Sequence, residues 1–177
     1  MLVHALHDHL SVVPPDEKLA KKPYVLRLRP PLPPRVRVYL YNATQHPSER
    51  QQGAFRIQLT SKDNPVPFSD SPRYTFNRSD GIRCLLMGYN SDLRAFILWD
   101  ADLHDAPPGY SFSRGVQAPP GVVFRAVARG MAEEQRHLKD GNRVETIIVA
   151  RPERLAEAIE RRVDLSLASL RGGAETC

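Results

Sequence analysis

The densest group of side chains that could do chemistry lies in the segment WDADLHD, residues 99–105. Asp100, Asp102 and His104 offer carboxylates and an imidazole close together in the chain, which are the ligand types that divalent metals use. Mg²⁺ or Mn²⁺ held there would suit a divergent metal-dependent endonuclease. Aspartates that follow a strand are also ordinary turn residues, so a solvated strand end is the alternative.

The rest of the sequence argues against a nuclease centre. Metal-dependent nucleases need carboxylates that converge on the ion, usually with a lysine two residues beyond an acid on a strand. The strand candidate at residues 55–58 reads FRIQ and has no acid. We therefore expect no catalytic residue, no metal and no cofactor in this chain, and favour a binding protein over an enzyme.

Aromatic side chains could instead hold a nucleobase. Trp99, the only tryptophan, supplies with Tyr39, Tyr41 and Tyr89 the faces that a flipped base needs. Asp100 could accept a hydrogen bond from the amino group of a cytosine. We expect a base pocket formed by Tyr41, Trp99 and Asp100, and packing in the core is the alternative for Trp99.

Two runs of alternating residues predict half-buried strands that display polar side chains. RVRVYLY, residues 35–41, places Arg35, Arg37, Tyr39 and Tyr41 on the face opposite its aliphatic residues. AFRIQLT, residues 54–60, does the same with Arg56 and Gln58. Because the segment between the runs is turn-rich, we expect a hairpin. Its outward face could contact phosphates and stack on bases.

A glycine-flanked segment, GYSFSRGVQ at residues 109–117, offers a further polar surface. We expect a loop here, and its candidate DNA contacts are Ser111, Ser113, Arg114 and Gln117. An ordinary polar surface loop is the alternative.

The excess of positive charge in the chain is confined to its first third. Residues 1–60 carry the whole net charge of +5, because sixteen basic and sixteen acidic residues balance from residue 61 onward. Between Lys18 and Arg56 there are nine basic side chains and one acid, Glu49. This local field suits a polyanion such as double-stranded DNA, although basic patches also occur on proteins that bind no nucleic acid.

The remaining pattern predicts one α+β domain with a curved mixed or antiparallel sheet, or an open β-barrel, and two helices. Apolar runs at 82–89 and 94–100 predict central strands. A helix over 121–138, a strand over 143–150 and a helix over 152–163 follow. We expect a proline-rich basic arm or edge segment at 1–34, the folded domain at 35–168 and a flexible tail at 169–177. No run approaches a membrane span, and two cysteines make no disulfide framework, so we expect a cytoplasmic protein.

Three blocks of the sequence resemble a known family. The blocks are YLYNATQHPSERQQGAFRIQLT, GIRCLLMGYNSDLRAFILWDADLH and YSFSRGVQ, followed by ETIIVARPERLAEAI. They are similar to the SRA-like DNA-reading domain of McrA-like, modification-dependent restriction endonucleases, where a separate HNH domain cuts. The resemblance implies an SRA/PUA-like fold and the reading of a modified cytosine by base flipping. It implies DNA contacts from Asn42, Thr44, Arg50, Arg56 and Gln58.

The leading hypothesis is a DNA-binding specificity module of a bacterial restriction-type system that acts in defence. No HNH segment follows in the sequence, so we expect the module to bind alone or to recruit a nuclease domain or subunit. Two alternatives stay open: the metal-dependent nuclease built on Asp100, Asp102 and His104, and a protein-interaction subunit that uses the proline-rich arm. The sequence leaves the oligomeric state open.

Overall fold

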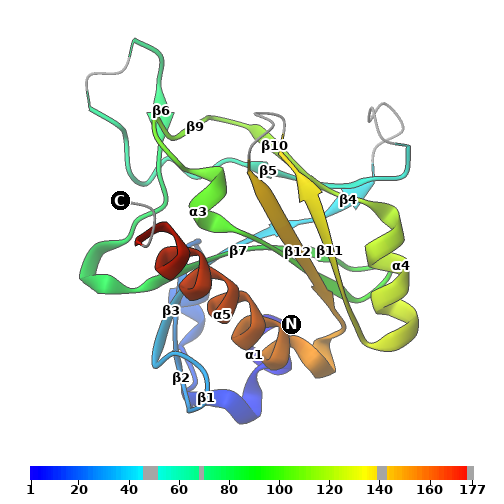
Figure 1. Cartoon of the computed structure of the whole chain (residues 1–177). Helices are drawn as coiled ribbons and strands as arrows, with labels where there is room; N and C mark the ends of the chain where they lie inside the picture. Colours follow the sequence, from blue (N-terminus) through cyan, green and yellow to red (C-terminus); the bar gives the residue numbers. More distant parts are fainter. Residues whose placement is uncertain (46–51, 68–69, 139–142, 175–177) are drawn as a thin grey trace.

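The computed structural model describes residues 1–45, 52–67, 70–138 and 143–174. Within these residues, seven strands form the main sheet in the spatial order β1-β2-β3-β7-β8-β12-β11 (Figure 1). In that order their bounds are Leu10–Val12, Tyr24–Leu28, Arg35–Asn42, Arg83–Asn90, Ala95–Trp99, Val144–Ala150 and Met131–His137. The pair β3 and β7 is parallel, and the other neighbours in this sheet are antiparallel.

Two smaller sheets and the helices cover the main sheet. The first small sheet has the order β10-β5-β4, with bounds Arg114–Ala118, Phe55–Leu59 and Thr44–Gln45. The second pairs β6 (Arg73–Tyr74) with β9 (Tyr110–Ser111). The α-helices are α1 (Leu2–Ala5), α2 (Asp16–Leu19), α3 (Ala101–His104), α4 (Pro120–Arg129) and α5 (Leu155–Ala174). Short 3₁₀ turns lie at His7–His9, Ser79–Gly81 and Pro152–Arg154.

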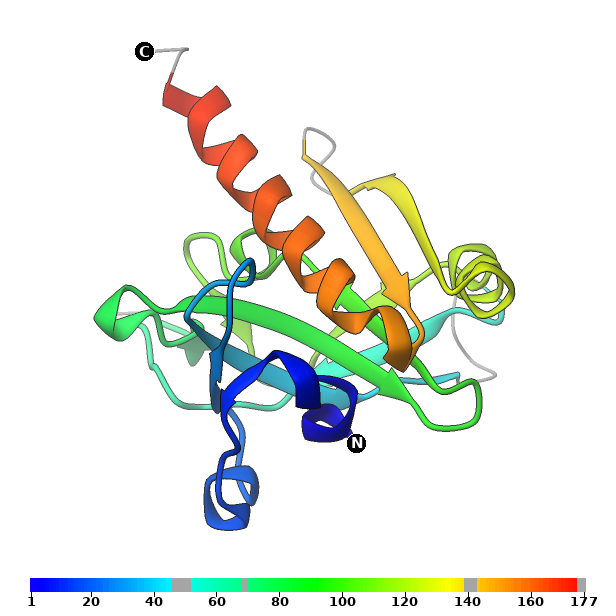
Figure 2. The ribbon, with the colours of Figure 1, turned by 90° about the horizontal axis from the view of Figure 1, so that it is seen from below.

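The hydrophobic core consists of two layers, one on each face of the main sheet. On one face, α5 and α1 pack through Leu155, Ile159 and Leu2 against aliphatic residues of the sheet. On the other face, the small sheet β10-β5-β4 and α4 pack around Trp99 and Tyr39. Figure 2 shows α5, in orange and red, crossing the sheet and α4, in yellow-green, beside the end of β11. Both faces of the central strands are therefore buried, as the apolar runs at 82–89 and 94–100 predict.

Gly88 allows the small sheet to approach the main sheet closely. A Cβ at this position would lie 2.8 Å from Cγ2 of Ile57 and 3.0 Å from Cζ3 of Trp99. Real side chains do not pack at 2.8 Å, so any larger residue would push the two layers apart. The absence of a side chain at Gly88 thus brings β5 against the core.

The α+β class and the strand expected at 143–150 are confirmed, and the sheet is mixed and mostly antiparallel. A helix follows Pro152 as expected, but residues 152–154 form a 3₁₀ turn and α5 runs from Leu155 to Ala174, past the expected end at residue 163. The described strands close no barrel, and the described residues contain five α-helices where the sequence indicated two. The segment at 1–34 contributes β1 and β2 to the main sheet, and Leu10 and Leu26 of these strands lie in the core. Within the part of the chain that the structure describes, no helix is both long and apolar enough to cross a membrane.

Three expected elements were wrong. The expected hairpin of residues 35–41 with 54–60 does not form, because β3 pairs with β2 and β7 while β5 pairs with β10 and, in antiparallel fashion, with the two-residue strand β4 that follows β3. The helix expected over 121–138 ends at Arg129, since Gly130 takes a φ of 87°, and the alternating residues that follow form β11. The loop expected at 109–117 contains β9 and β10, whose extended backbone pairs with β6 and β5.

Candidate nucleic-acid interface

Polar side chains from three separate segments share the outward face of the small sheet β10-β5-β4. Strand β5 buries Phe55, Ile57 and Leu59 against the main sheet and leaves the side chains between them on the other face. The pairing places Thr44 and Gln117 beside Arg56, and Gly115 beside Gln58. We call these five residues the polar sheet face. It brings together four of the residues for which the sequence indicates DNA contacts.

Gly115 accommodates the guanidinium group of Arg56. A Cβ on Gly115 would lie 2.6 Å from Nε and 2.9 Å from Nη2 of Arg56. The arginine head therefore lies flat over the neighbouring strand, in the space that any other residue at position 115 would fill. This packing holds a cation in the middle of the polar sheet face, next to the exposed amide of Gln58.

The turn between β9 and β10 extends this face at one end. Ser111 and Ser113 are exposed, and the backbone N–H of Ser113 donates a 2.7 Å hydrogen bond to the carbonyl of Leu59. Nearby in the chain, Nζ of Lys62 lies 4.2 Å from the centre of the Phe112 ring. Hydroxyls and a cation thus lie at the end of the polar sheet face.

Two exposed arginines face each other across β2 and β3. Arg27 lies directly opposite Arg35 in the register, and both side chains are exposed. Like charges directly opposite on neighbouring strands repel each other. Neither arginine has an ion-pair partner among the described residues. By contrast, Arg125 pairs with Glu134 and Arg161 with Glu133. Both glutamates lie on β11, the strand at the opposite edge of the main sheet. The alternation in YVLRL could have indicated Arg27 as a site residue.

Arg37, Tyr39 and Tyr41 of β3 are buried, which corrects the expectation of an exposed strand face. Arg37 is 6% exposed, and Nη1 and Nη2 donate to Asn77 and to Ser79 Oγ. The hydroxyl of Tyr39 accepts a 2.8 Å hydrogen bond from the N–H of Asn77, and burial raises the pKa of Tyr39 to about 12. Segment 73–79 covers this part of the strand, so the alternation of residues was right and the exposure was wrong.

Tyr41 is also buried, under a lysine. Nζ of Lys22 lies 3.6 Å from the centre of the Tyr41 ring, and burial raises the pKa of the Tyr41 hydroxyl. Asn42, at the end of β3, is exposed. Arg50 lies outside the described residues.

Trp99 belongs to the core. It has no exposed surface, and its indole Nε1 donates a 2.8 Å hydrogen bond to the backbone carbonyl of Gln117. Asp100 caps α3 by accepting the N–H of Asp102 at 2.9 Å, and its other oxygen pairs with Nη2 of Arg162 on α5 at 2.9 Å. Burial raises the pKa of Asp100, and Arg162 opposes this effect. Trp99 therefore packs in the hydrophobic core and bonds to β10, whereas Asp100 caps the start of α3.

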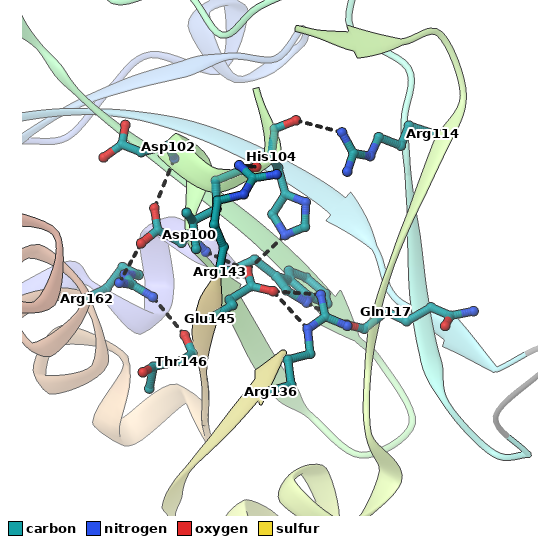
Figure 3. A network of polar contacts seen from close by, with 12 residues as sticks. Asp100, Asp102, His104, Arg114, Gln117, Arg136, Arg143, Glu145, Thr146 and Arg162 are labelled. Carbon is teal, nitrogen blue, oxygen red and sulfur yellow. Dashed lines mark hydrogen bonds and ion pairs between the residues drawn. The ribbon is translucent and has the colours of Figure 1, made fainter. Parts of the chain in front are cut away.

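A buried carboxylate, Glu145 on β12, lies at the centre of the network beside Asp100 (Figure 3). One oxygen of Glu145 lies 2.8 Å from Nε2 of His104 and 3.0 Å from the N–H of Asp100. The other oxygen accepts both Nε and Nη2 of Arg136. Burial alone would raise the pKa of Glu145, but the hydrogen bonds and charges of His104 and Arg136 outweigh it and lower the pKa.

The expected metal ligands take separate partners. Asp100 pairs with Arg162, His104 with Glu145, and Asp102 with Arg78 at 2.7 Å. Among the residues that the structure describes, no group of three or more His, Cys, Asp or Glu side chains could hold a metal ion.

The buried network positions the small sheet. Nη1 of Arg114, the first residue of β10, donates to the carbonyl of His104 at 3.2 Å, and Arg143 donates to the carbonyl of Leu103 at 3.2 Å (Figure 3). With the bond from Trp99 to Gln117, β10 is thus held at both ends. Trp99 and His104, which the sequence suggested for a base pocket and a metal site, therefore hold β10, one of the strands of the polar sheet face, in place.

Comparison with known proteins adds one finding. The family model described as Methylase-associated X1 matches residues 34–159, which cover β3 to the first turn of α5. No curated protein and no solved structure matches the chain.

Proposed function

Because the chain belongs to the Methylase-associated X1 family, a restriction-modification-associated domain, we propose that it binds double-stranded DNA as the specificity module of a restriction-modification system. The match covers the residues that build the polar sheet face and Arg35. A domain that accompanies a DNA methylase acts where duplex DNA is the substrate, and this setting supports DNA as the partner.

The observation that carries the proposal is the exposed pair Arg27 and Arg35. Two guanidinium groups side by side without a carboxylate repel each other in the free protein, and a phosphate between them would relieve this repulsion. Alternation along β3 directs Arg35 to the face of the main sheet that also carries the small sheet, since Val36 and Val38 point to the α5 side. The arginine pair and the polar sheet face would thus contact one duplex from the same side of the protein.

The polar sheet face has the side chains that read base edges. An arginine pairs with the two acceptors of guanine, and glutamine amides pair with adenine. The major groove admits a two-stranded β-ribbon, and the β5–β10 ribbon presents Arg56, Gln58 and Gln117 along its outer surface. We therefore assign base reading to this ribbon and backbone contact to the arginine pair.

In its finer form, the proposal is that the base read is a modified cytosine. A 5-methyl group lies in the major groove, within reach of a β-ribbon. A nuclease domain or subunit would then act on the DNA that this module selects. The likeness to SRA-like domains stays a prediction.

The test is the affinity of the purified chain for matched unmodified, methylated and hydroxymethylated duplexes, measured by fluorescence anisotropy at two salt concentrations. We expect binding that weakens steeply with salt, because phosphate contacts release counterions. Preference for one modified duplex would support the finer form. Equal, salt-dependent affinity would leave a DNA-binding module without it, and affinity that salt does not change would overturn the phosphate contacts.

A further inference from the structure

A hollow of about 550 Å³ opens at the ends of the parallel strands β3 and β7. The residues that line it include Asn42, Thr44, Tyr89, Asp92 and Phe124. Its size is within the range of about 300–1,000 Å³ that is usual for small-molecule sites. Thr44 also belongs to the polar sheet face, so the hollow borders the candidate DNA interface.

The walls of the hollow are held by hydrogen bonds within the protein. Asn90 donates to the carbonyl of Ala43 at 2.9 Å and accepts the N–H of Leu93 at 2.9 Å. The amide of Gln45 donates to the carbonyl of Gly53 at 2.7 Å. These side chains fix the β7–β8 turn and the β4 strand, so the hollow is shaped before any ligand arrives.

Other groups in the hollow are exposed and suited to a planar ligand. Phe124 on α4 is 52% exposed and rests on Phe55 with ring centres 6.1 Å apart in an edge-to-face arrangement. Because the ring packs against Phe55, its position is held and its exposed side offers a stacking surface. The carboxylate of Asp92 meets the hydroxyl of Ser91 at 3.3 Å and keeps further acceptor capacity. Asn42 adds an exposed amide that can both donate and accept.

From these contacts we propose that the hollow binds a nucleobase that carries an exocyclic amino group. Stacking on Phe124 suits any base, but a carboxylate accepts hydrogen bonds only, which favours cytosine or adenine over thymine. The described residues that line the hollow include the carboxylate of Asp92, which repels a phosphate and so favours the uncharged base as the ligand part bound there. Where the base comes from a bound duplex, this inference deepens the proposed function and rests on it.

The experiment uses free nucleosides and a duplex with a single 2-aminopurine, whose fluorescence rises when the base leaves the stack. We expect at least tenfold weaker base binding for Phe124→Ala and for Asp92→Ala, since both side chains line the hollow and are exposed. Leu167→Ala, an exposed apolar position on α5, is the matched control and should bind as the unaltered chain does.

The outcomes distinguish the source of the base and separate the two proposals. A fluorescence rise that Phe124→Ala and Asp92→Ala abolish shows a base taken from DNA. Binding of cytidine and adenosine over thymidine, lost in Asp92→Ala, with no rise on the duplex, shows a free nucleoside and still supports the hollow, even if the chain binds no duplex. Salt-dependent duplex binding without any effect of the two substitutions on either base probe keeps the proposed function and overturns this inference.

Discussion

The indole nitrogen of Trp99 donates a 2.8 Å hydrogen bond to the backbone carbonyl of Gln117, and so joins the central strand β8 to strand β10 of the small sheet. The side chain of Gln117 lies on the polar sheet face, on the outer side of the same strand. A core residue therefore holds in place a strand whose outer surface is a candidate for reading DNA.

Trp99→Phe should weaken the fold because it removes this bond and leaves unfilled space. The carbonyl of Gln117 would lose its donor, and the smaller ring would not replace the contacts of the indole. We expect the free energy of unfolding to fall by about 2–3 kcal/mol in urea denaturation. Leu167→Ala, which changes an exposed side chain, should stay within about 0.5 kcal/mol of the unaltered protein. A similarly small loss for Trp99→Phe would show that the bond does not secure β10.

Gly88→Ala tests how closely the two sheets pack. The new Cβ would lie 2.8 Å from Cγ2 of Ile57, so the sheets must separate locally. We expect a loss of about 1–3 kcal/mol in the free energy of unfolding. Gly121→Ala, in the first turn of α4, is the matched control. Its new Cβ would approach only Nη1 of Arg125, at 3.4 Å. Equal stability of the two variants would contradict the close approach at Gly88.

Glu145→Gln should change how stability depends on pH. The folded protein lowers the pKa of Glu145 below its usual 4.5, so this carboxylate stabilises the fold above its unfolded pKa. That contribution is lost as the pH falls through the lower, folded value. Replacing the carboxylate leaves Arg136 and His104 without their anion, which should cost about 3 kcal/mol near neutral pH.

The measurement is urea denaturation of both proteins between about pH 7 and pH 3. The stability difference between them should shrink as the pH falls below the usual glutamate pKa. Burial raises the pKa of Asp100, which acts in the opposite direction, but both proteins retain Asp100 and its effect largely cancels in the comparison. A difference that stays constant down to pH 3 would show that Glu145 carries no charge-dependent stabilisation.

Local patterns in the sequence were sufficient for the buried strands and the last helix. The apolar runs before and after the turn at residue 91 formed β7 and β8, because continuous apolar residues leave no face for water. Pro152 followed by a stripe of Leu155, Ala158 and Ile159 was sufficient for the first part of α5, although the expected helix ended at residue 163 and α5 continues to Ala174. These elements depend on neighbours in the chain, so the sequence alone could indicate them.

The pairing of strands and the cover over β3 depend on distant residues and could not be read locally. Tyr39 is tolerated inside because its hydroxyl accepts the N–H of Asn77, a residue 38 positions away. The helix expected through residue 138 followed from alanines and glutamates, but Gly130 ends it and the alternation after Met131 matches a strand. For the site, the sequence indicated Thr44, Arg56, Gln58 and Gln117 as DNA contacts, but it did not indicate that these residues lie on one sheet.

Arg35→Ala should weaken DNA binding and its dependence on salt. If Arg35 contacts a phosphate, its loss reduces the salt slope of binding by about one counterion and lowers affinity similarly for all sequences. Anisotropy titrations at three salt concentrations measure both effects. Arg125→Ala is the control, because that arginine is already paired with Glu134 at 2.7 Å and should leave the slope unchanged. The same slope for Arg35→Ala would place the phosphate contact elsewhere.

Gly115→Ala should separate folding from base reading. Its Cβ would lie 2.6 Å from Nε of Arg56, but this neighbour is the far end of a flexible side chain, which can turn away. We therefore expect the free energy of unfolding to change by less than about 1 kcal/mol. The displaced guanidinium could no longer meet a base edge in the same place, and a bidentate contact is worth about 1–3 kcal/mol of discrimination. Affinity for a preferred duplex should thus fall about tenfold while affinity for random duplex changes little. An equal loss on both duplexes would assign Arg56 to the phosphate backbone, and no loss on either would remove the polar sheet face from the DNA interface.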